Sequence, residues 1–180
     1  MLYFVGGGLC AGYDLNSALE SCYKRSKTNL GTSKKWPESM NADTNGIVST
    51  LPDHSKFANW TKIVFMYCDG SLHQGNNKSP VQYKDTSLYF RGSVNTRAHI
   101  KWADMKYNLS QAERIMVCGS SAGGMATYLW TDHVRGLVPN PNVVYGVADS
   151  SVYYAPFINS VQNLTLKKKA NLLKILNEDN

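Results

Sequence analysis

The sequence predicts an α/β protein whose mostly parallel sheet is flanked by helices. Two observations support this fold class: short apolar runs alternate with segments of helical character, and glycines and acidic residues follow the ends of those runs. Strands that are separated by helices tend to pair in parallel, and the two faces of a parallel sheet are covered. The 180 residues and a hydrophobic content of 43% suit one domain with a buried core.

The apolar runs give the expected strands, at residues 2–5, 61–67, 87–91, 115–118 and 143–148. Helical character is predicted for part of the segment that ends at Lys24 and for residues 94–106 and 125–134. Residues 25–59 are expected to form a long surface excursion, and residues 71–86 a loop. Three tryptophans are expected in packed positions: Trp60, Trp102 and Trp130.

Helix 94–106 is expected to carry Ala98, Trp102 and Met105 on one side. The chain opens inside a strand-like run, and residues 163–180 form an amphipathic segment with no return to the sheet. We therefore expect residues 1–180 to be the N-terminal and central part of one domain that is incomplete at both ends. No signal peptide is visible in this chain.

Composition argues against several functional classes. The net charge is +6, but the basic residues are scattered and form no stripe with interleaved aromatics, so nucleic-acid binding is not expected. No apolar run approaches the length of a transmembrane span. No Cys-x-x-Cys pair is present, so a zinc or redox site is not expected. No metal site and no cofactor are predicted.

The most specific motif is Gly-Ser-Ser-Ala-Gly-Gly at residues 119–124, directly after an apolar run. Gly-x-Ser-x-Gly between a strand and a helix is typical of a nucleophile elbow, a sharp turn that lifts a serine hydroxyl off the sheet edge. Gly119 and Gly123 make the turn sterically possible, and the helix N-terminus favours negative charge. This predicts Ser121 as a nucleophile. The alternative is a loop that only joins a strand to a helix.

Three glycines at residues 6–8 follow the first apolar run. An acyl-transfer serine needs hydrogen-bond donors for the developing oxyanion. One donor is the N–H of the residue after the nucleophile, here Ala122, and the second comes from a Gly-rich turn after an earlier strand. Without Cβ atoms the glycine backbone can approach a substrate oxygen closely. The alternative is a flexible turn.

Cysteines and glycosylation sequons indicate the compartment. Cys10 and Cys22 flank a short polar loop and could close a small disulfide ring, whereas Cys118 lies in an apolar run and is expected to be a free core thiol. Asn-x-Ser/Thr sequons occur at Asn59, Asn77, Asn108 and Asn163. Together these features favour a secreted or vacuolar/lysosomal protein.

The chain resembles the pectin acetylesterase family, which includes the animal carboxylesterase Notum. The resembling stretches are residues 6–10, 67–70 with His73 and Gly75 beyond, 90–92, 119–124 and 149–151. The resemblance implies an α/β-hydrolase-like fold and hydrolysis of carboxylic esters on an acylated carbohydrate or an acylated protein. Plant members remove acetyl groups from pectin, and Notum removes a fatty acyl group from a signalling protein. The resemblance assigns Ser121 as the nucleophile, Gly7, Gly8 and Ala122 as the oxyanion hole, and Cys10–Cys22 as a disulfide.

The triad acid and base have no clear candidates. In this fold they follow the nucleophile in the order acid, then His, and in the family both lie well beyond the motif at residues 149–151. His133 follows Ser121 but lies about 18 Å along the elbow helix. His73 is expected on a surface loop, and Asp69 and Asp149 are expected to accept backbone N–H bonds at strand ends.

The sequence therefore predicts a serine carboxylesterase, and a 180-residue chain that is nearly inactive alone because it lacks the base. The family has Glu, Trp and Gly where this chain has Val5, Leu9 and Ser151. These departures favour one alternative, a non-catalytic glycan- or lipid-binding pseudoenzyme. A serine peptidase on the same fold would share the elbow but not the motifs at residues 67–70 and 90–92. The acyl group, the leaving alcohol and the oligomeric state stay open.

Overall fold

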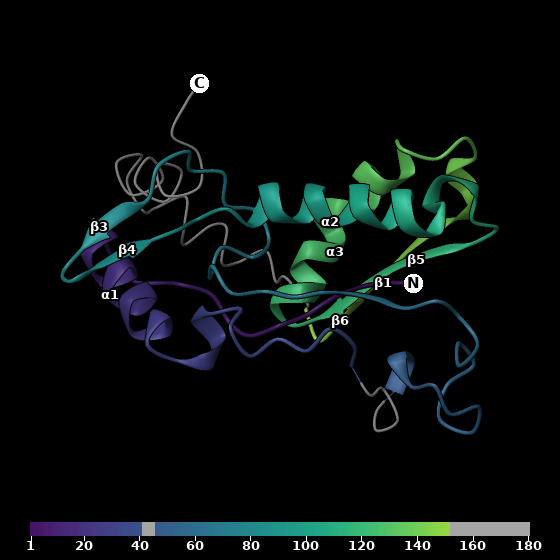
Figure 1. Cartoon of the computed structure of the whole chain (residues 1–180), viewed down its shortest axis with the longest axis horizontal. Coiled ribbons are helices and arrows are strands. Elements are labelled where there is room, and N and C mark those ends of the chain that lie inside the picture. Colours follow the sequence, from purple (N-terminus) through teal and green to yellow (C-terminus); the bar gives the residue numbers. More distant parts are fainter. Residues whose placement is uncertain (41–45, 152–180) are drawn as a thin grey trace.

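The centre of the protein is a parallel sheet of four strands in the order β2–β1–β5–β6 (Figure 1). The structure is a computed structural model that describes residues 1–40 and 46–151. The strands of this sheet are β1 (Leu2–Phe4), β2 (Ile63–Phe65), β5 (Ile115–Ser120) and β6 (Val144–Asp149). The predicted α/β class with a parallel sheet is confirmed.

A second, antiparallel sheet is the hairpin of β3 (Val81–Tyr83) and β4 (Thr86–Leu88). The sequence predicted a loop over residues 71–86 and a single strand at 87–91, which is wrong for β3. In Figure 1 the hairpin lies at the opposite end of the molecule from the N-terminus, beside helix α1 (Leu15–Ser26). Ion pairs Lys27–Asp85 and Lys84–Glu20 tie the hairpin to this helical segment.

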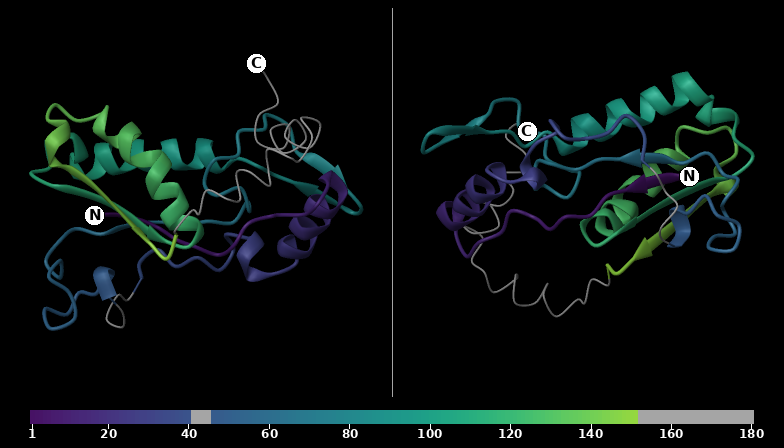
Figure 2. Two further views of the ribbon diagram at one scale, coloured as in Figure 1. Left: turned by 180° about the vertical axis from the view of Figure 1, so that it is seen from behind. Right: turned by 60° about the horizontal axis from the view of Figure 1, so that its bottom comes forward.

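Two longer helices, α2 (Gly92–Tyr107) and α3 (Ala122–Arg135), lie on one face of the parallel sheet (Figures 1 and 2). The remaining helical elements are the 3₁₀ turns η1 (Asn29–Gly31), η2 (Gly46–Val48), η3 (Leu109–Gln111) and η4 (Pro141–Val143). Local sequence fixes the helix ends: the Asp14 side chain accepts the Ser17 N–H at 2.7 Å at the start of α1. Asn108 ends α2 in the left-handed conformation, with φ 54°.

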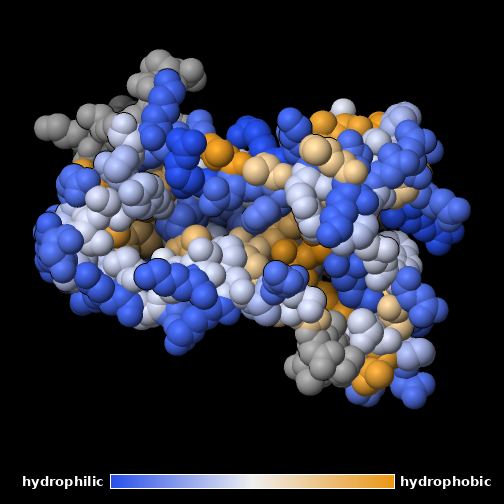
Figure 3. All heavy atoms as spheres, viewed as in Figure 1, coloured by the Kyte–Doolittle hydropathy of each residue, from blue (hydrophilic) through white to orange (hydrophobic). Residues whose placement is uncertain are grey.

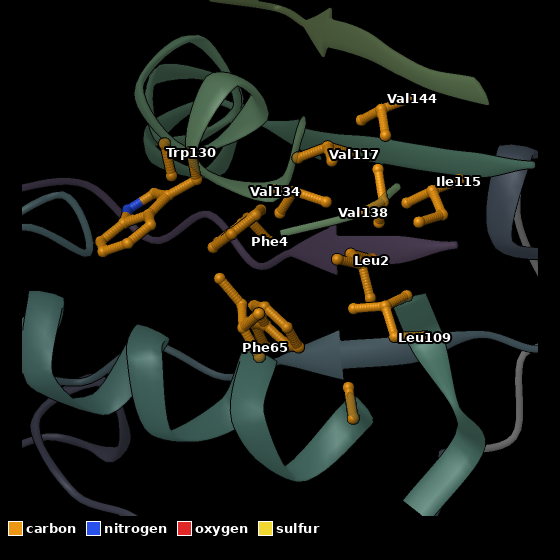
Figure 4. Close-up of a cluster of buried hydrophobic side chains, with 13 residues drawn as sticks. Leu2, Phe4, Phe65, Leu109, Ile115, Val117, Trp130, Val134, Val138 and Val144 are labelled. Atoms are coloured by element: carbon orange, nitrogen blue, oxygen red, sulfur yellow. The ribbon is translucent and has the colours of Figure 1, made fainter. Parts of the chain in front are cut away.

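The main core lies between the sheet and helices α2 and α3, and Figure 4 shows its side chains converging from both sides. Phe4 and Phe65 meet edge to face with ring centroids 4.9 Å apart. Trp130 of α3 is buried against this cluster, as predicted. From α2, Ile100 and Ala103 point into this core.

Trp102 and Met105 are 47% and 77% exposed. On the outer side of α2 the Trp102 ring packs edge to face on Tyr107, so this tryptophan covers a neighbour on the surface and not the core. Ala98 is exposed as well, so these three residues share one side of α2, as predicted, and that side faces solvent.

Residues 46–60 cover the opposite face of the sheet. Ile47, Val48, Phe57 and Trp60 pack on a second cluster formed by Met1, Met116 and Cys118. This segment is therefore part of the fold and not only the surface excursion that the sequence predicted. Cys118 is buried and free, as predicted, and burial raises the pKa of its thiol to about 11.

On the face shown in Figure 3, hydrophilic side chains cover most of the area, and hydrophobic ones gather in a hollow near the middle. Within residues 1–40 and 46–151, the longest helices are too short and too polar to cross a lipid bilayer.

Candidate active site

Ser121 sits at the sharp turn between β5 and α3. Its backbone has φ 56° and ψ −121°, a combination that is rare for a residue with a side chain, and its side chain is exposed. The Ser121 N–H donates to the Asp149 carbonyl at 3.1 Å, and its carbonyl accepts the Met125 N–H at 3.1 Å. Such strained conformations cost about 1–3 kcal/mol and cluster at functional sites. The turn therefore has the geometry of a nucleophile elbow.

Glycines allow the elbow to pack against the end of β1. A Cβ atom added to Gly123 would lie 1.9 Å from the Phe4 carbonyl oxygen. One added to Gly6 would lie 2.6 Å from the Ser120 carbonyl oxygen and 3.2 Å from Cβ of Ser121. The chain after β1 and the elbow are thus in direct backbone contact.

Gly6 is the first residue of a turn, here called the glycine turn (residues 6–8). Gly7 and Gly8 have φ 134° and 72°, in the region that favours glycine. Within the described part of the chain, their N–H groups donate to no acceptor. The Ala122 N–H stands at the first position of α3, where no intrahelical acceptor exists. The predicted donors and the serine are thus supplied by two segments in contact with each other.

Arg25, near the end of α1, reaches the glycine turn from outside. Its Nη1 donates to the Gly7 carbonyl at 2.5 Å, and its Nε donates to the Cys68 carbonyl at 3.1 Å. The guanidinium carbon lies 4.8 Å from the centre of the Tyr67 ring. The sequence analysis missed Arg25, because an arginine on a polar helix carries no local signal of such contacts.

His73 is buried, and the prediction of a surface loop histidine is wrong. It is 3% exposed, and its ring stacks on Tyr67 with centroids 4.5 Å apart. Its Nε2 lies 2.9 Å from the Val5 carbonyl, the residue before the glycine turn. Its own carbonyl accepts the Trp130 indole N–H at 3.1 Å. Burial raises the pKa of Tyr67 to about 12 and lowers the pKa of His73.

The lowered pKa of His73 predicts a pH-dependent stability. Burial is the main cause, and the nearby His99 acts in the same direction, whereas the bond to Val5 and the charge of Asp69 oppose it. Below a pH of about 6.5 the unfolded chain binds more protons at this histidine than the folded chain does. We therefore expect the free energy of unfolding to fall between pH 7 and pH 5, as followed by urea titration.

The matched variant for this prediction is His73→Gln, which removes the titration and can still donate to the Val5 carbonyl. Its stability should fall less over the same pH range. An equal fall in both proteins would assign the effect to His99 or His133, whose pKa values burial also lowers.

Asp69 fixes the loop after β2, as predicted. Its carboxylate accepts the Ser71 N–H at 3.2 Å and the Ser71 hydroxyl at 2.5 Å. The same Ser71 oxygen accepts the Gly75 N–H at 2.8 Å. Asp149 acts differently, because its main-chain carbonyl, and not its carboxylate, holds the elbow through Ser121.

Ser151 is a second residue that the sequence analysis did not assign to the elbow. Its Oγ lies 2.7 Å from the carbonyl oxygens of both Ser121 and Asp149. The serine that departs from the family pattern thus bonds to the backbone of the elbow itself.

Cys10 and Cys22 form a disulfide in the structure, and Cys68 is a free, half-buried thiol. The disulfide lies against the loop after β2, where the Cys10 N–H donates to the Gly70 carbonyl at 2.9 Å. It thereby joins α1 to the segment that follows the glycine turn.

The short ring closed by this disulfide predicts its effect on stability. Cross-linking positions 12 residues apart removes entropy from the unfolded chain, a contribution of about 3 kcal/mol for a loop of roughly this size. The variant with both Cys10→Ser and Cys22→Ser should lose about that much free energy of unfolding in urea titration. Cys68→Ser is the control and should change it much less, and an equal loss in the control would contradict the prediction.

The four sequons differ in accessibility. Asn59 and Asn108 are exposed, and Asn163 lies outside the described residues. The expectation for Asn77 needs correction, because this residue is only 3% exposed. Its N–H donates to the Phe90 carbonyl and its carbonyl accepts from Arg91, so the folded chain does not offer it as a glycosylation site.

Two further histidines, His133 and His99, pack against aromatic rings. His133 lies in the last turn of α3 and packs against Trp130, as far along the helix as predicted. His99 packs on Phe65 from α2. Among residues 1–40 and 46–151, no group of His, Cys, Asp or Glu side chains has the arrangement of a metal site.

The known proteins that this chain resembles are pectin acetylesterases and Notum carboxylesterases. The sequence model of the family Pectinacetylesterase matches residues 1–174. Pectin acetylesterase 4 from Arabidopsis thaliana is 32% identical over 150 residues, which are 83% of this chain and 34% of that protein. Palmitoleoyl-protein carboxylesterase NOTUM from Drosophila melanogaster is 30% identical over 128 residues, which are 67% of this chain and 19% of that protein.

A structure of the Wnt deacylase Notum from Drosophila superimposes with a TM-score of 0.68 at 28% identity, and covers 83% of this chain and 43% of that one. The α/β-hydrolase-like fold is thereby confirmed. The chain spans about a third of the length of the plant relative and less of the animal one. Pectin acetylesterases and Notum are carboxylic ester hydrolases by name, and this chain belongs to the pectinacetylesterase family.

Proposed function

We propose that this chain carries the nucleophile and the oxyanion hole of a serine carboxylesterase, with Ser121 as the nucleophile and Gly7, Gly8 and Ala122 as the donors. The observation that carries the proposal is the exposed Ser121 at φ 56° and ψ −121°, in contact with the glycine turn through Gly6. A loop that only joins a strand to a helix has no need of this strain.

The chemistry follows from these positions. The Ser121 oxygen attacks the ester carbonyl carbon, and the carbonyl oxygen becomes an oxyanion that accepts hydrogen bonds from the free N–H groups. The alcohol then leaves with a proton, and water hydrolyses the acyl-enzyme. In such enzymes the loss of one oxyanion donor lowers kcat by about 10²–10³-fold.

Activation of Ser121 needs a general base, and we propose that neither this base nor the triad acid is among residues 1–180. His73 is 3% exposed and its Nε2 is engaged with Val5, while His133 stands at the far end of α3. The chain spans only part of the length of its relatives, which supports the placement of the base and the acid elsewhere in a longer protein.

The substrate that we propose is an O-acyl ester, acetyl or fatty acyl, of a carbohydrate or a protein. The names of the relatives support both, because one kind is a pectin acetylesterase and the other a palmitoleoyl-protein carboxylesterase. We also propose that the whole protein is secreted or vacuolar/lysosomal. The Cys10–Cys22 disulfide and the exposed sequons at Asn59 and Asn108 support an oxidising compartment.

The test is an ester hydrolysis assay on the 180-residue chain and on a longer version of it, with 4-nitrophenyl acetate and a long-chain 4-nitrophenyl ester. We expect Ser121-dependent turnover from the longer version and almost none from the short one. The preferred ester then separates the two acyl classes. Robust Ser121-dependent turnover by the short chain would contradict the placement of the base, and no turnover by either form would contradict the proposed function.

A further inference from the structure

We propose that Arg25 is a positioning residue for the oxyanion hole: by holding the Gly7 carbonyl, it fixes the direction in which the Gly8 N–H points. This inference rests on the proposed role of the glycine turn. It adds to the site a side chain from a helix that supplies neither the nucleophile nor a donor.

Arg25 makes two hydrogen bonds to main-chain carbonyls at once. Nη1 binds the Gly7 carbonyl at 2.5 Å while Nε binds the Cys68 carbonyl at 3.1 Å. A guanidinium is planar and rigid, so two simultaneous bonds fix its orientation. The ring of Tyr67 supports it at 4.8 Å. The Gly7 carbonyl is therefore tied to Tyr67 and Cys68, in the segment that follows β2, and not only to its own turn.

The peptide bond between Gly7 and Gly8 passes this anchoring on to the Gly8 N–H. All peptide bonds between described residues are trans, and in a trans peptide the C=O of one residue and the N–H of the next point in opposite directions. Anchoring the Gly7 C=O on Arg25 thus directs the Gly8 N–H to the other side of the chain. A peptide between two glycines has more accessible orientations than any other, so this direction needs an external anchor.

Side chains hold the glycine turn at two carbonyls, that of Val5 just before it and that of Gly7 within it. His73 holds the Val5 carbonyl at 2.9 Å, just before the turn, and His73 and Arg25 both contact the ring of Tyr67. Of the described side chains, Arg25 alone donates a hydrogen bond to the carbonyls of Gly7 and Gly8. Without it, the peptide that carries a proposed donor would lose its anchor while the start of the turn stayed in place.

A purely structural role for Arg25 can be separated from this one. Basic residues in the last turn of a helix stabilise it through the helix dipole, and both Lys24 and Arg25 occupy the last turn of α1. Lys24 is exposed and bonds to no part of the turn. Lys24→Met therefore removes the same charge from the same turn and is the matched control for Arg25→Met.

The first measurement needs no catalysis. In the 180-residue chain labelled with ¹⁵N-glycine, the amide order parameters of Gly7 and Gly8 should be about 0.85, as in rigid backbone. In Arg25→Met they should fall below about 0.6. They should stay unchanged in Lys24→Met, as should those of Gly119 and Gly123 in every variant. Arg25→Lys, which retains one donor, should give intermediate values. Unchanged order parameters at Gly7 and Gly8 in a folded Arg25→Met variant would overturn the proposal.

The second measurement is kinetic, in the form of the protein that shows Ser121-dependent turnover. Arg25→Met should lower kcat by about 10²-fold and leave KM within about twofold, because the oxyanion develops only after substrate binds. Arg25→Lys should restore part of kcat. A rise in KM at constant kcat, or an equal loss in Lys24→Met, would overturn the positioning role. If no form hydrolyses esters, the proposed function fails, and the order parameters alone decide whether Arg25 holds the turn.

Discussion

Replacing Ser121 with alanine is expected to abolish the ester hydrolysis of this protein. The variant keeps the elbow and the free N–H groups but has no oxygen that can attack the carbonyl carbon. Loss of the nucleophile lowers kcat by about 10⁶-fold in a well-studied serine hydrolase, and only binding and oxyanion stabilisation remain. The measurement is kcat/KM with 4-nitrophenyl acetate, in the longer version of the chain.

The matched control is Ser120→Ala, one residue earlier. Ser120 ends β5, is half-buried, and touches Gly6 through its main chain, which the substitution leaves in place. This variant should keep kcat/KM within severalfold, and both variants should have the far-UV circular dichroism of the parent. If Ser120→Ala were the inactive variant and Ser121→Ala the active one, the assignment of the nucleophile would be wrong.

The elbow could be predicted from the sequence because its causes are local. A strand buried on both faces must be apolar, and a turn packed against a neighbouring strand must be made of small residues, so the pattern at residues 115–124 shows both directly. The same reasoning found β1 and β6 to within about two residues. In these segments the sequence and the packing carry the same information.

The parts that could not be predicted depend on partners far away in the chain. Arg25 and Gly7 are 18 positions apart, and His73 and Val5 are 68 apart, so no local pattern reveals either bond. The hairpin strand β3 is only three residues long and has no buried residue, so it is too short for a clear alternation. Residues 25–59 are mostly polar, so the sequence did not predict that a few apolar side chains within residues 46–60 cover the sheet.

The glycine at position 123 is expected to be essential for folding of the elbow. In a helix, alanine is favoured over glycine by about 1 kcal/mol, so helix propensity alone predicts that Gly123→Ala stabilises the protein. The added Cβ, however, would lie 1.9 Å from the Phe4 carbonyl oxygen and 2.6 Å from its carbon. These are backbone atoms of the central strand β1, which pairs with β5 and β2 and cannot move alone.

The steric effect should therefore exceed the propensity gain, and we expect Gly123→Ala to lower the free energy of unfolding by about 3 kcal/mol or more. Gly136→Ala is the control, because this glycine follows the same helix with φ −71° and an added Cβ would meet nothing closer than 3.5 Å. It should be neutral or stabilising by up to about 1 kcal/mol. Urea titration of both variants measures the difference, and equal stabilities would mean that β1 and the elbow are not in the contact that places the glycine turn beside Ser121.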